Sequence, residues 1–184
     1  GIINMQNKHQ KVQTLLDAIP YIKKFFGKVI VIKYGGSAQT SPDLKEKFAQ
    51  DIVLLSLLGI KPVIVHGGGA RITELLTKLE IPSHFVEGHR VTCKESMRVV
   101  EMVLSGEINK NLTSLLNHHG AKAIGISGKD SSMINAVPKD GGRFGYTGEI
   151  TKVKGTMINN LIKEGFIWLL YTSDAAEEGV SGDR

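Results

Sequence analysis

The stretch KVIVIKYGGSA, residues 28–38, is followed along the chain by PVIVHGGGA, residues 62–70. In both stretches a β-branched apolar run ends on consecutive glycines. An apolar run without polar alternation is typical of a strand that is buried on both faces of a parallel sheet. Glycine directly after such a strand frees the backbone for positive φ and removes the Cβ that would keep a ligand away.

These glycines have two interpretations. They can be plain tight turns that connect a strand to a helix. Backbone N–H groups at a strand-to-helix turn also form an anion site, which the helix dipole strengthens. Ligands of open α/β sheets bind at the carboxyl ends of the strands. Because the pattern occurs twice, we favour a site for phosphate or carboxylate groups.

The composition narrows the class of protein. The chain has 184 residues, of which 41% are hydrophobic, enough for one globular domain with a core. Its charge of +5 is scattered and only 6% of its residues are aromatic, which argues against nucleic-acid binding and fits small anionic ligands. No apolar run approaches the roughly 20 residues that cross a bilayer, and no signal peptide is recognisable. The single cysteine, Cys93, excludes an internal disulfide and suits the cytoplasm, and we interpret it as a packing residue.

Apolar spacing predicts the order of the elements. Helices are expected at 8–26 (kinked or divided at Pro20), from the N-cap Ser41 to Gly59, and at 70–79, 94–104, 106–118 and 156–164. Strands are expected at 28–33, 62–65 and 122–126 and in a hairpin of 133–137 with 146–153, whereas 87–92 is expected to be a loop. The last helix leads to an apolar run at 166–171. Strands that alternate with helices imply right-handed crossovers. The predicted fold is therefore α/β, a three-layer αβα sandwich with a mainly parallel central sheet.

Lys33 is the candidate catalytic residue. It ends the first apolar run directly before Tyr34-Gly35-Gly36, where its amine can extend past the strand tip into the anion site. The alternative is a solvated surface lysine. We favour function, because a strand core rarely admits a charge that is not paired. We interpret His66 as a turn residue, and no His pair or carboxylate cluster predicts a metal site.

Six segments carry a resemblance to a known family, and they occur in the order IKYGGSA, VIVHGGGARI, HFVEGHRVT, EMVLSGEINKNL, AIGISGKD and GYTGEI. In this order they resemble the N-acetyl-L-glutamate kinases of arginine biosynthesis, in the amino-acid kinase superfamily. The resemblance extends from about Leu15 to Ile167 and departs from the family at Ala70, where the family has proline. It implies that ATP, with Mg²⁺, phosphorylates the side-chain carboxylate of N-acetyl-L-glutamate. That carboxylate is ionised at pH 7, so it needs no general base.

The resemblance also implies roles for single residues. Lys33 would stabilise the transition state, and Gly35 and Gly36 would donate N–H groups to the phosphoryl oxygens. Gly68 and Gly69 would hold the substrate, and Arg90 would clamp its α-carboxylate; the alternative for Arg90 is a surface ion pair. Catalysis would then consist of aligning two anions and neutralising charge as the phosphoryl group moves.

The resemblance divides the chain into three parts. Residues 1–27 form an N-terminal helix that, in arginine-inhibited relatives, interlaces dimers into a hexamer; packing of this helix on its own domain is the alternative. Residues 28–167 form the lobe that binds N-acetyl-L-glutamate. Residues 168–184 are expected to be a disordered tail outside the family, with the ATP-binding half missing. We therefore expect a cytoplasmic homo-oligomer, incomplete as written, with little or no turnover by itself and with an uncovered apolar sheet face.

Two other functions stay open at this point. The chain can belong to another amino-acid kinase that acts on glutamate, aspartate, carbamate or a nucleoside monophosphate, although the GHRVT and GEINKNL segments argue against these. It can also be a non-catalytic module that only binds N-acetyl-L-glutamate or only mediates oligomerisation.

Overall fold

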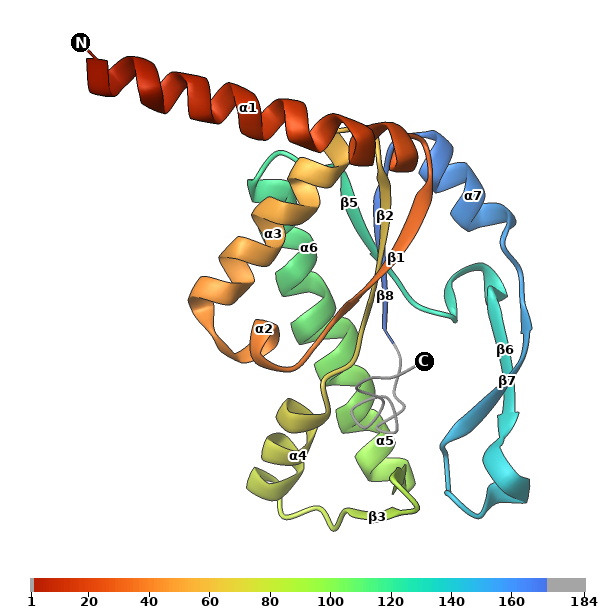
Figure 1. The fold of residues 1–184 in the computed structure, drawn as a ribbon. Coiled ribbons are helices and arrows are strands. Elements are labelled where there is room, and N and C mark those ends of the chain that lie inside the picture. The colour runs from red at the N-terminus through yellow and green to blue at the C-terminus, as the bar shows by residue number, and fades with distance from the viewer. Residues whose placement is uncertain (1, 172–184) are drawn as a thin grey trace.

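The central sheet has four strands and lies between two layers of helices (Figure 1). The structure is a computed structural model that describes residues 2–171. The strand order is β1 (Val29–Tyr34), β2 (Lys61–His66), β8 (Ile167–Tyr171) and β5 (Ala123–Ile126), and each neighbouring pair is parallel. The predicted αβα sandwich with a parallel sheet is confirmed.

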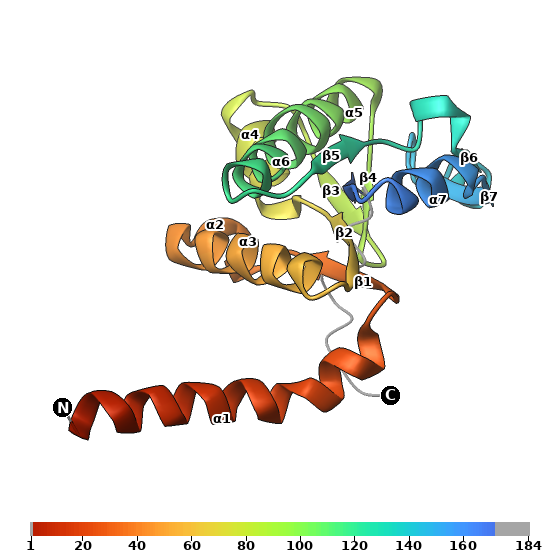
Figure 2. The same ribbon diagram turned by 90° about the horizontal axis from the view of Figure 1, so that it is seen from above.

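Each face of the sheet packs on a different set of helices. On one face, α3 (Pro42–Leu57) and α6 (Asn109–His118) cover a core that includes Tyr34, Ile64 and Leu169. On the other face, α7 (Thr156–Lys163) packs beside a core that includes Val63 and Trp168. Alternate residues of one strand enter different cores because side chains of a strand point to opposite faces in turn. The two helical layers are seen from above in Figure 2.

Helix α3 begins where the sequence predicts. The Ser41 hydroxyl accepts a hydrogen bond from the Leu44 N–H at 3.4 Å, and Pro42 occupies the first turn of α3. Gly59, with φ of 81°, follows the end of this helix. This positive φ favours glycine, and a Cβ here would also require the exposed Phe26 ring to shift, since it would lie 2.3 Å from that ring. A short helix, α2 (Ser37–Thr40), precedes α3.

The prediction of a loop at 87–92 is wrong in part. After α4 (Gly69–Lys78), β3 (His84–Val86) and β4 (His89–Val91) pair as an antiparallel hairpin. The two residues between these strands, Glu87 and Gly88, have φ of 51° and 77°. Positive φ at both central residues is the conformation of a two-residue hairpin turn that matches the strand twist.

The two helices expected at 94–104 and 106–118 are one continuous helical stretch. It consists of α5 (Lys94–Glu101), the π-helical segment η1 (Met102–Ile108) and α6. The prediction of a break at residue 105 is wrong because the chain widens its hydrogen-bonding pattern there and does not stop. Cys93 does not pack in the core as expected; it is exposed and its sulfur caps α5 by accepting from the Ser96 N–H at 3.3 Å.

The predicted hairpin of 133–137 with 146–153 is confirmed. Strands β6 (Ile134–Pro138) and β7 (Gly148–Val153) pair in antiparallel fashion, flanked by the 3-10 turns η2 (Asp130–Ser132) and η3 (Lys139–Gly142). This hairpin holds β4 through the Thr147 hydroxyl, which donates to the Arg90 carbonyl at 2.8 Å.

The predicted disordered tail begins too early. Trp168–Tyr171 belong to β8, which lies between β2 and β5 and is thus an interior strand of the sheet. Trp168 and Leu169 are buried because each enters one of the two cores. The rest of the expected tail, residues 172–184, lies outside the described residues.

The N-terminal helix, α1 (Ile2–Phe25), projects from the body of the molecule as a long arm (Figures 1 and 2). It is assigned without a break across Pro20, so the predicted division there is wrong. Its apolar residues Val12, Leu15 and Leu16 are exposed, so they do not pack on their own domain. The expected uncovered sheet face is also present, since Val29 and Val31 of the outer strand β1 are 50% and 67% exposed. None of the helices in residues 2–171 has the length and apolar character of a membrane span.

Candidate functional site

The two glycine turns lie side by side at one edge of the sheet. Strands β1 and β2 are parallel neighbours, and their register pairs Tyr34 with His66. The glycines that follow each strand therefore start at the same level. The Gln39 side chain joins the two turns, because its Nε2 lies 3.2 Å from the Tyr34 carbonyl oxygen and 2.8 Å from that of Gly67. The expectation that both turns share one sheet edge is confirmed.

The first turn is open. Gly36 has φ of 54° and ψ of −134°, a conformation that favours glycine. A Cβ built at Gly35 or Gly36 would meet no atom within 4 Å. Backbone strain at residue 36, and not crowding, therefore calls for glycine here, and the space beside both residues leaves room for a ligand to approach the main chain.

The second turn is tightly packed on one side. Gly68 is buried, and a Cβ there would lie 2.3 Å from Ile108 Cδ1 and 3.1 Å from Leu104 Cδ2. A side chain at this position would therefore require Ile108 of η1 to shift. Gly69 begins α4, a ten-residue helix. The first N–H groups of a helix have no intrahelical acceptor, so the turn and the helix dipole together favour an anion.

Lys33 lies on the face of β1 opposite to Tyr34. The Tyr34 ring is buried on the α3 side, with its centroid 4.6 Å from that of Phe48. Lys33 is exposed and shares the other face with Val31. The structure thus brings Lys33 to the edge that carries both glycine turns, on the face that α3 and α6 do not cover.

Arg90, in β4, lies beside the second glycine turn. It is only 4% exposed, so it is not the surface ion pair considered above. Its guanidinium donates from Nη1 to the Ser83 hydroxyl at 2.6 Å and from Nη2 to the Thr73 hydroxyl at 2.9 Å. Nη2 also lies 3.4 Å from the Gly69 carbonyl oxygen, and the guanidinium carbon is 4.6 Å from the centre of the Phe85 ring. These contacts fix a planar cation beside the start of α4.

A buried polar network supports the same edge. His66 is fully buried, and its Nε2 lies 3.1 Å from Asn109 Nδ2. Asn109 Nδ2 also donates to the Leu169 carbonyl at 3.3 Å, and the Lys110 amine donates to Asn109 Oδ1 at 3.1 Å and to the Gly125 carbonyl at 3.0 Å. The sequence interpretation of His66 as a turn residue missed this network. The signal was present in GEINKNL, where two polar residues stand next to each other at the start of a helix.

Burial lowers the pKa of His66 below 6.5, and the nearby Lys110 ammonium acts in the same direction, although the hydrogen bond to the Gly67 carbonyl opposes them. The ring is therefore neutral at pH 7. Both ring nitrogens have neighbours, since Nδ1 lies 3.2 Å from the Gly67 carbonyl oxygen. His66 is thus a structural group of the glycine turn.

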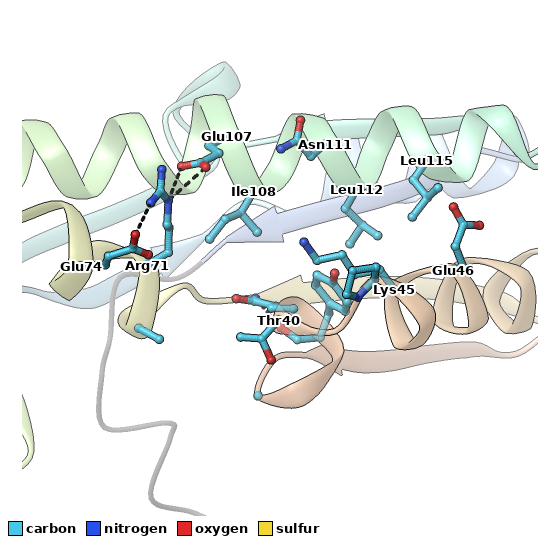
Figure 3. A pocket seen from close by; sticks show the side chains of 15 residues that line it. Thr40, Lys45, Glu46, Arg71, Glu74, Glu107, Ile108, Asn111, Leu112 and Leu115 are labelled. Atoms are coloured by element: carbon cyan, nitrogen blue, oxygen red, sulfur yellow. Dashed lines mark hydrogen bonds and ion pairs between the residues drawn. The ribbon is translucent and has the colours of Figure 1, made fainter.

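A cavity of about 640 Å³ lies on the helical side, between α3, α4 and α6 (Figure 3). Arg71 bridges two carboxylates at its rim, with Nε at 3.1 Å from both Glu107 oxygens and Nη1 at 3.1 Å from Glu74. Leu112 and Leu115 form part of its apolar wall. Gly36 and Gln39 of the first turn and Ala70 after the second also line this cavity, so it reaches both glycine turns, whereas Lys33 lies on the opposite face of β1. Among residues 2–171, no group of His, Cys, Asp or Glu side chains is arranged to hold a metal ion.

Comparisons with known proteins agree with this geometry. The amino acid kinase family matches residues 28–183, which includes most of the segment placed outside the family above. Acetylglutamate kinase of Aliarcobacter butzleri is 83% identical over 163 residues, covering 89% of this chain and 54% of that protein. Acetylglutamate kinase of Wolinella succinogenes is 63% identical over 174 residues, covering 95% and 61%. The chain spans a little over half the length of these relatives.

Two solved structures share the fold. The protein smu.665 from Streptococcus mutans UA159 is 30% identical with a TM-score of 0.69, over 78% of this chain and 58% of that one. N-acetylglutamate synthase from Neisseria gonorrhoeae, complexed with coenzyme A and N-acetyl-glutamate, is 24% identical with a TM-score of 0.75, over 87% and 37%. The second likeness shows the fold alone. With the family match over 28–183, this chain belongs to the amino acid kinase family.

Proposed function

We propose that this chain forms the substrate lobe of an acetylglutamate kinase, which transfers a phosphoryl group from ATP, with Mg²⁺, to the side-chain carboxylate of N-acetyl-L-glutamate. The observation that carries the proposal is the buried Arg90 guanidinium beside the second of two adjacent glycine turns. The 83% and 63% identity to proteins named acetylglutamate kinase supports the choice of substrate. Because the chain spans only 54–61% of those proteins, the complete reaction is proposed for the longer protein.

Arg90 is the proposed ligand of the α-carboxylate. A guanidinium is planar and offers parallel donors that match a carboxylate. The hydroxyls of Ser83 and Thr73 orient the guanidinium. Gly68 and Gly69 are the proposed main-chain donors to the substrate, because they open α4 directly beside this guanidinium.

Lys33, Gly35 and Gly36 are the proposed phosphoryl-transfer residues. Lys33 stands at the sheet edge that carries both turns, and the open space at the two glycines lets phosphate oxygens reach their N–H groups. The chemistry then consists of holding two anions in line and neutralising the charge that spreads over the moving group. No base is required because the attacking carboxylate is already ionised, which agrees with His66 being buried and neutral.

The proposal extends to assembly and location. The exposed apolar residues of α1, among them Leu15 and Leu16, favour a partner surface, and we propose a homo-oligomer that uses this helix, either as a dimer or as a hexamer. A cytoplasmic location is proposed from the single cysteine, Cys93.

A two-ligand calorimetric experiment tests the substrate assignment. The ligands are N-acetyl-L-glutamate and 4-acetamidobutanoate, which keeps the acetamide and the side-chain carboxylate but lacks the α-carboxylate. The unchanged chain is expected to bind N-acetyl-L-glutamate about tenfold to a hundredfold more tightly, as one charge-assisted hydrogen-bond pair provides. In Arg90→Ala the two affinities should become equal. Arg98→Ala, which removes an exposed arginine of α5, should keep the difference.

Arg90→Lys distinguishes loss of binding from loss of folding. It keeps the positive charge of the side chain and loses the planar guanidinium. This variant should retain the circular dichroism spectrum and lose most of the preference for N-acetyl-L-glutamate. Equal affinity of the unchanged chain for the two ligands, or a preference that survives in both Arg90 variants, would contradict the assignment.

A further inference from the structure

The Gly67 carbonyl is held by two side chains. Gln39 Nε2 lies 2.8 Å from this oxygen, and His66 Nδ1 lies 3.2 Å from it. The orientation of Asn109 identifies the tautomer of the His66 ring. Asn109 Nδ2 faces the Leu169 carbonyl and Oδ1 faces the Lys110 amine, so Nδ2 is the donor toward His66 Nε2. The neutral ring therefore carries its proton on Nδ1 and donates it to Gly67.

The direction of that carbonyl fixes the direction of the next amide. The Gly67–Gly68 peptide is trans, like the other peptides in residues 2–171, and in a planar trans peptide C=O and N–H point in opposite directions. Gln39 and His66 both approach from the side of the sheet that α3 and α6 cover: Gln39 lines the cavity on that side, and His66, the register partner of Tyr34, contacts Asn109 of α6. The Gly68 N–H therefore points toward the side from which Lys33 projects.

Because residues 67 and 68 are both glycine, contacts are needed to fix the orientation of the peptide between them. A peptide between two glycines meets no Cβ on either side, so both orientations of its plane are accessible to the backbone. Packing favours glycine at residue 68, because a Cβ there would meet the side chains of Ile108 and Leu104 in the η1 segment. The Gly67–Gly68 peptide can therefore take more than one orientation. Hydrogen-bond partners are needed to select one of them.

We infer that Gln39 and His66 are positioning residues that lock the Gly67–Gly68 peptide with its N–H facing the anion site. This inference rests on the proposed function for the identity of the anion, which is a carboxylate oxygen of N-acetyl-L-glutamate. Gln39 acts through the peptide and does not itself touch the ligand. Its second contact, to the Tyr34 carbonyl, couples the same lock to the first glycine turn.

The test uses the chain labelled with ¹⁵N-glycine and the variant Gln39→Met, which keeps an unbranched side chain of similar length and removes both donors. Gln50→Met, at an exposed position of α3, is the matched control. The measured quantity is the residual dipolar coupling of the Gly68 N–H in the ligand-free chain. It should change in Gln39→Met and stay the same in Gln50→Met, while the coupling of Gly128, in the turn after β5, stays the same in both.

The second measurement is calorimetric binding of N-acetyl-L-glutamate. Gln39→Met should bind about threefold to tenfold more weakly than the unchanged chain, the loss expected for one misdirected donor. An unchanged Gly68 coupling in Gln39→Met, or a changed coupling with unchanged affinity, would overturn the inference. If the Gly68 coupling changes in Gln39→Met but the unchanged chain does not bind N-acetyl-L-glutamate, Gln39 does orient the Gly67–Gly68 peptide and the proposed function is wrong.

Discussion

Asn109 Nδ2 lies 3.1 Å from His66 Nε2, and both residues are fully buried. This pair connects α6 to the end of β2, and through the Leu169 carbonyl it also connects to the interior strand β8. A buried polar network beneath the glycine turns therefore ties this edge of the sheet to α6.

Asn109→Ala should lower the free energy of unfolding by about 2–4 kcal/mol. The variant leaves His66 Nε2 and the Leu169 carbonyl without this donor, and each buried polar atom that loses its partner costs about 1–3 kcal/mol. Urea denaturation measures the change. Asn111→Ala, at an exposed position of the same helix, is the control and should change stability by less than about 0.5 kcal/mol. Equal effects of the two variants would contradict the structural role of Asn109.

The stability of the chain should fall as the pH drops below about 6.5. Burial lowers the pKa of His66 in the folded state, whereas in the unfolded chain the ring titrates near 6.5. The unfolded state therefore binds the proton first, so the contribution of neutral His66 is complete above pH 6.5 and is lost as the pH falls from there toward the lower folded pKa. Urea midpoints measured between about pH 7.5 and pH 5.5 should show this decline.

His66→Gln should flatten that pH dependence, because glutamine does not titrate in this range. His118→Gln, which replaces an exposed histidine, should leave the slope as it is. A slope that is the same in His66→Gln and in the unchanged chain would show that another group causes the acid sensitivity.

Gly68→Ala should destabilise the fold by about 1–3 kcal/mol, the cost of forcing an extra methyl group into a packed site. The added Cβ would lie 2.3 Å from Ile108 Cδ1. Adding Ile108→Val removes that methyl group, so the double variant should cost less than the sum of the two single changes. Strict additivity in a double-mutant cycle of urea denaturations would contradict the predicted contact.

The Cys93 thiol should react with iodoacetamide at a lower pH in the folded chain than in the urea-unfolded chain. Hydrogen bonds from Ser96, first from its side chain and then from its backbone, lower the pKa of this exposed thiol. The measurement is the alkylation rate as a function of pH. Ser96→Ala removes the side-chain contribution and should move the curve back toward higher pH; coincident curves for folded and unfolded chains would refute the shift.

The sequence predicts the parts of the site that depend on local patterns. Unbroken β-branched runs identified β1 and β2, and the glycines after them located both turns at one sheet edge. The Ser41-Pro42 pair gave the start of α3 correctly. These features are set by backbone preferences of a few neighbouring residues, so they are visible without the fold.

Other features depend on contacts between distant segments. The sheet face from which Lys33 projects follows from which side α3 and α6 cover, and the hold of Gln39 on Gly67 joins residues 28 positions apart. The π-helical widening at Met102–Ile108 has no equally clear sequence signal, so one helical stretch was predicted as two helices. Trp168–Tyr171 were assigned to a tail because their letters depart from the resembled family, although their apolar run fits an interior strand.

The most direct test of the whole account follows the Gly68 and Gly69 amides by ¹H–¹⁵N NMR while N-acetyl-L-glutamate is added to the uniformly ¹⁵N-labelled chain. The account predicts that both amide protons move downfield together and saturate with one dissociation constant, because they donate to the same carboxylate. If these two resonances stay in place while the amides of Asn111 and Leu115, beside the cavity of Figure 3, shift instead, the ligand binds against α6 and not at the second glycine turn, which contradicts the proposed substrate site.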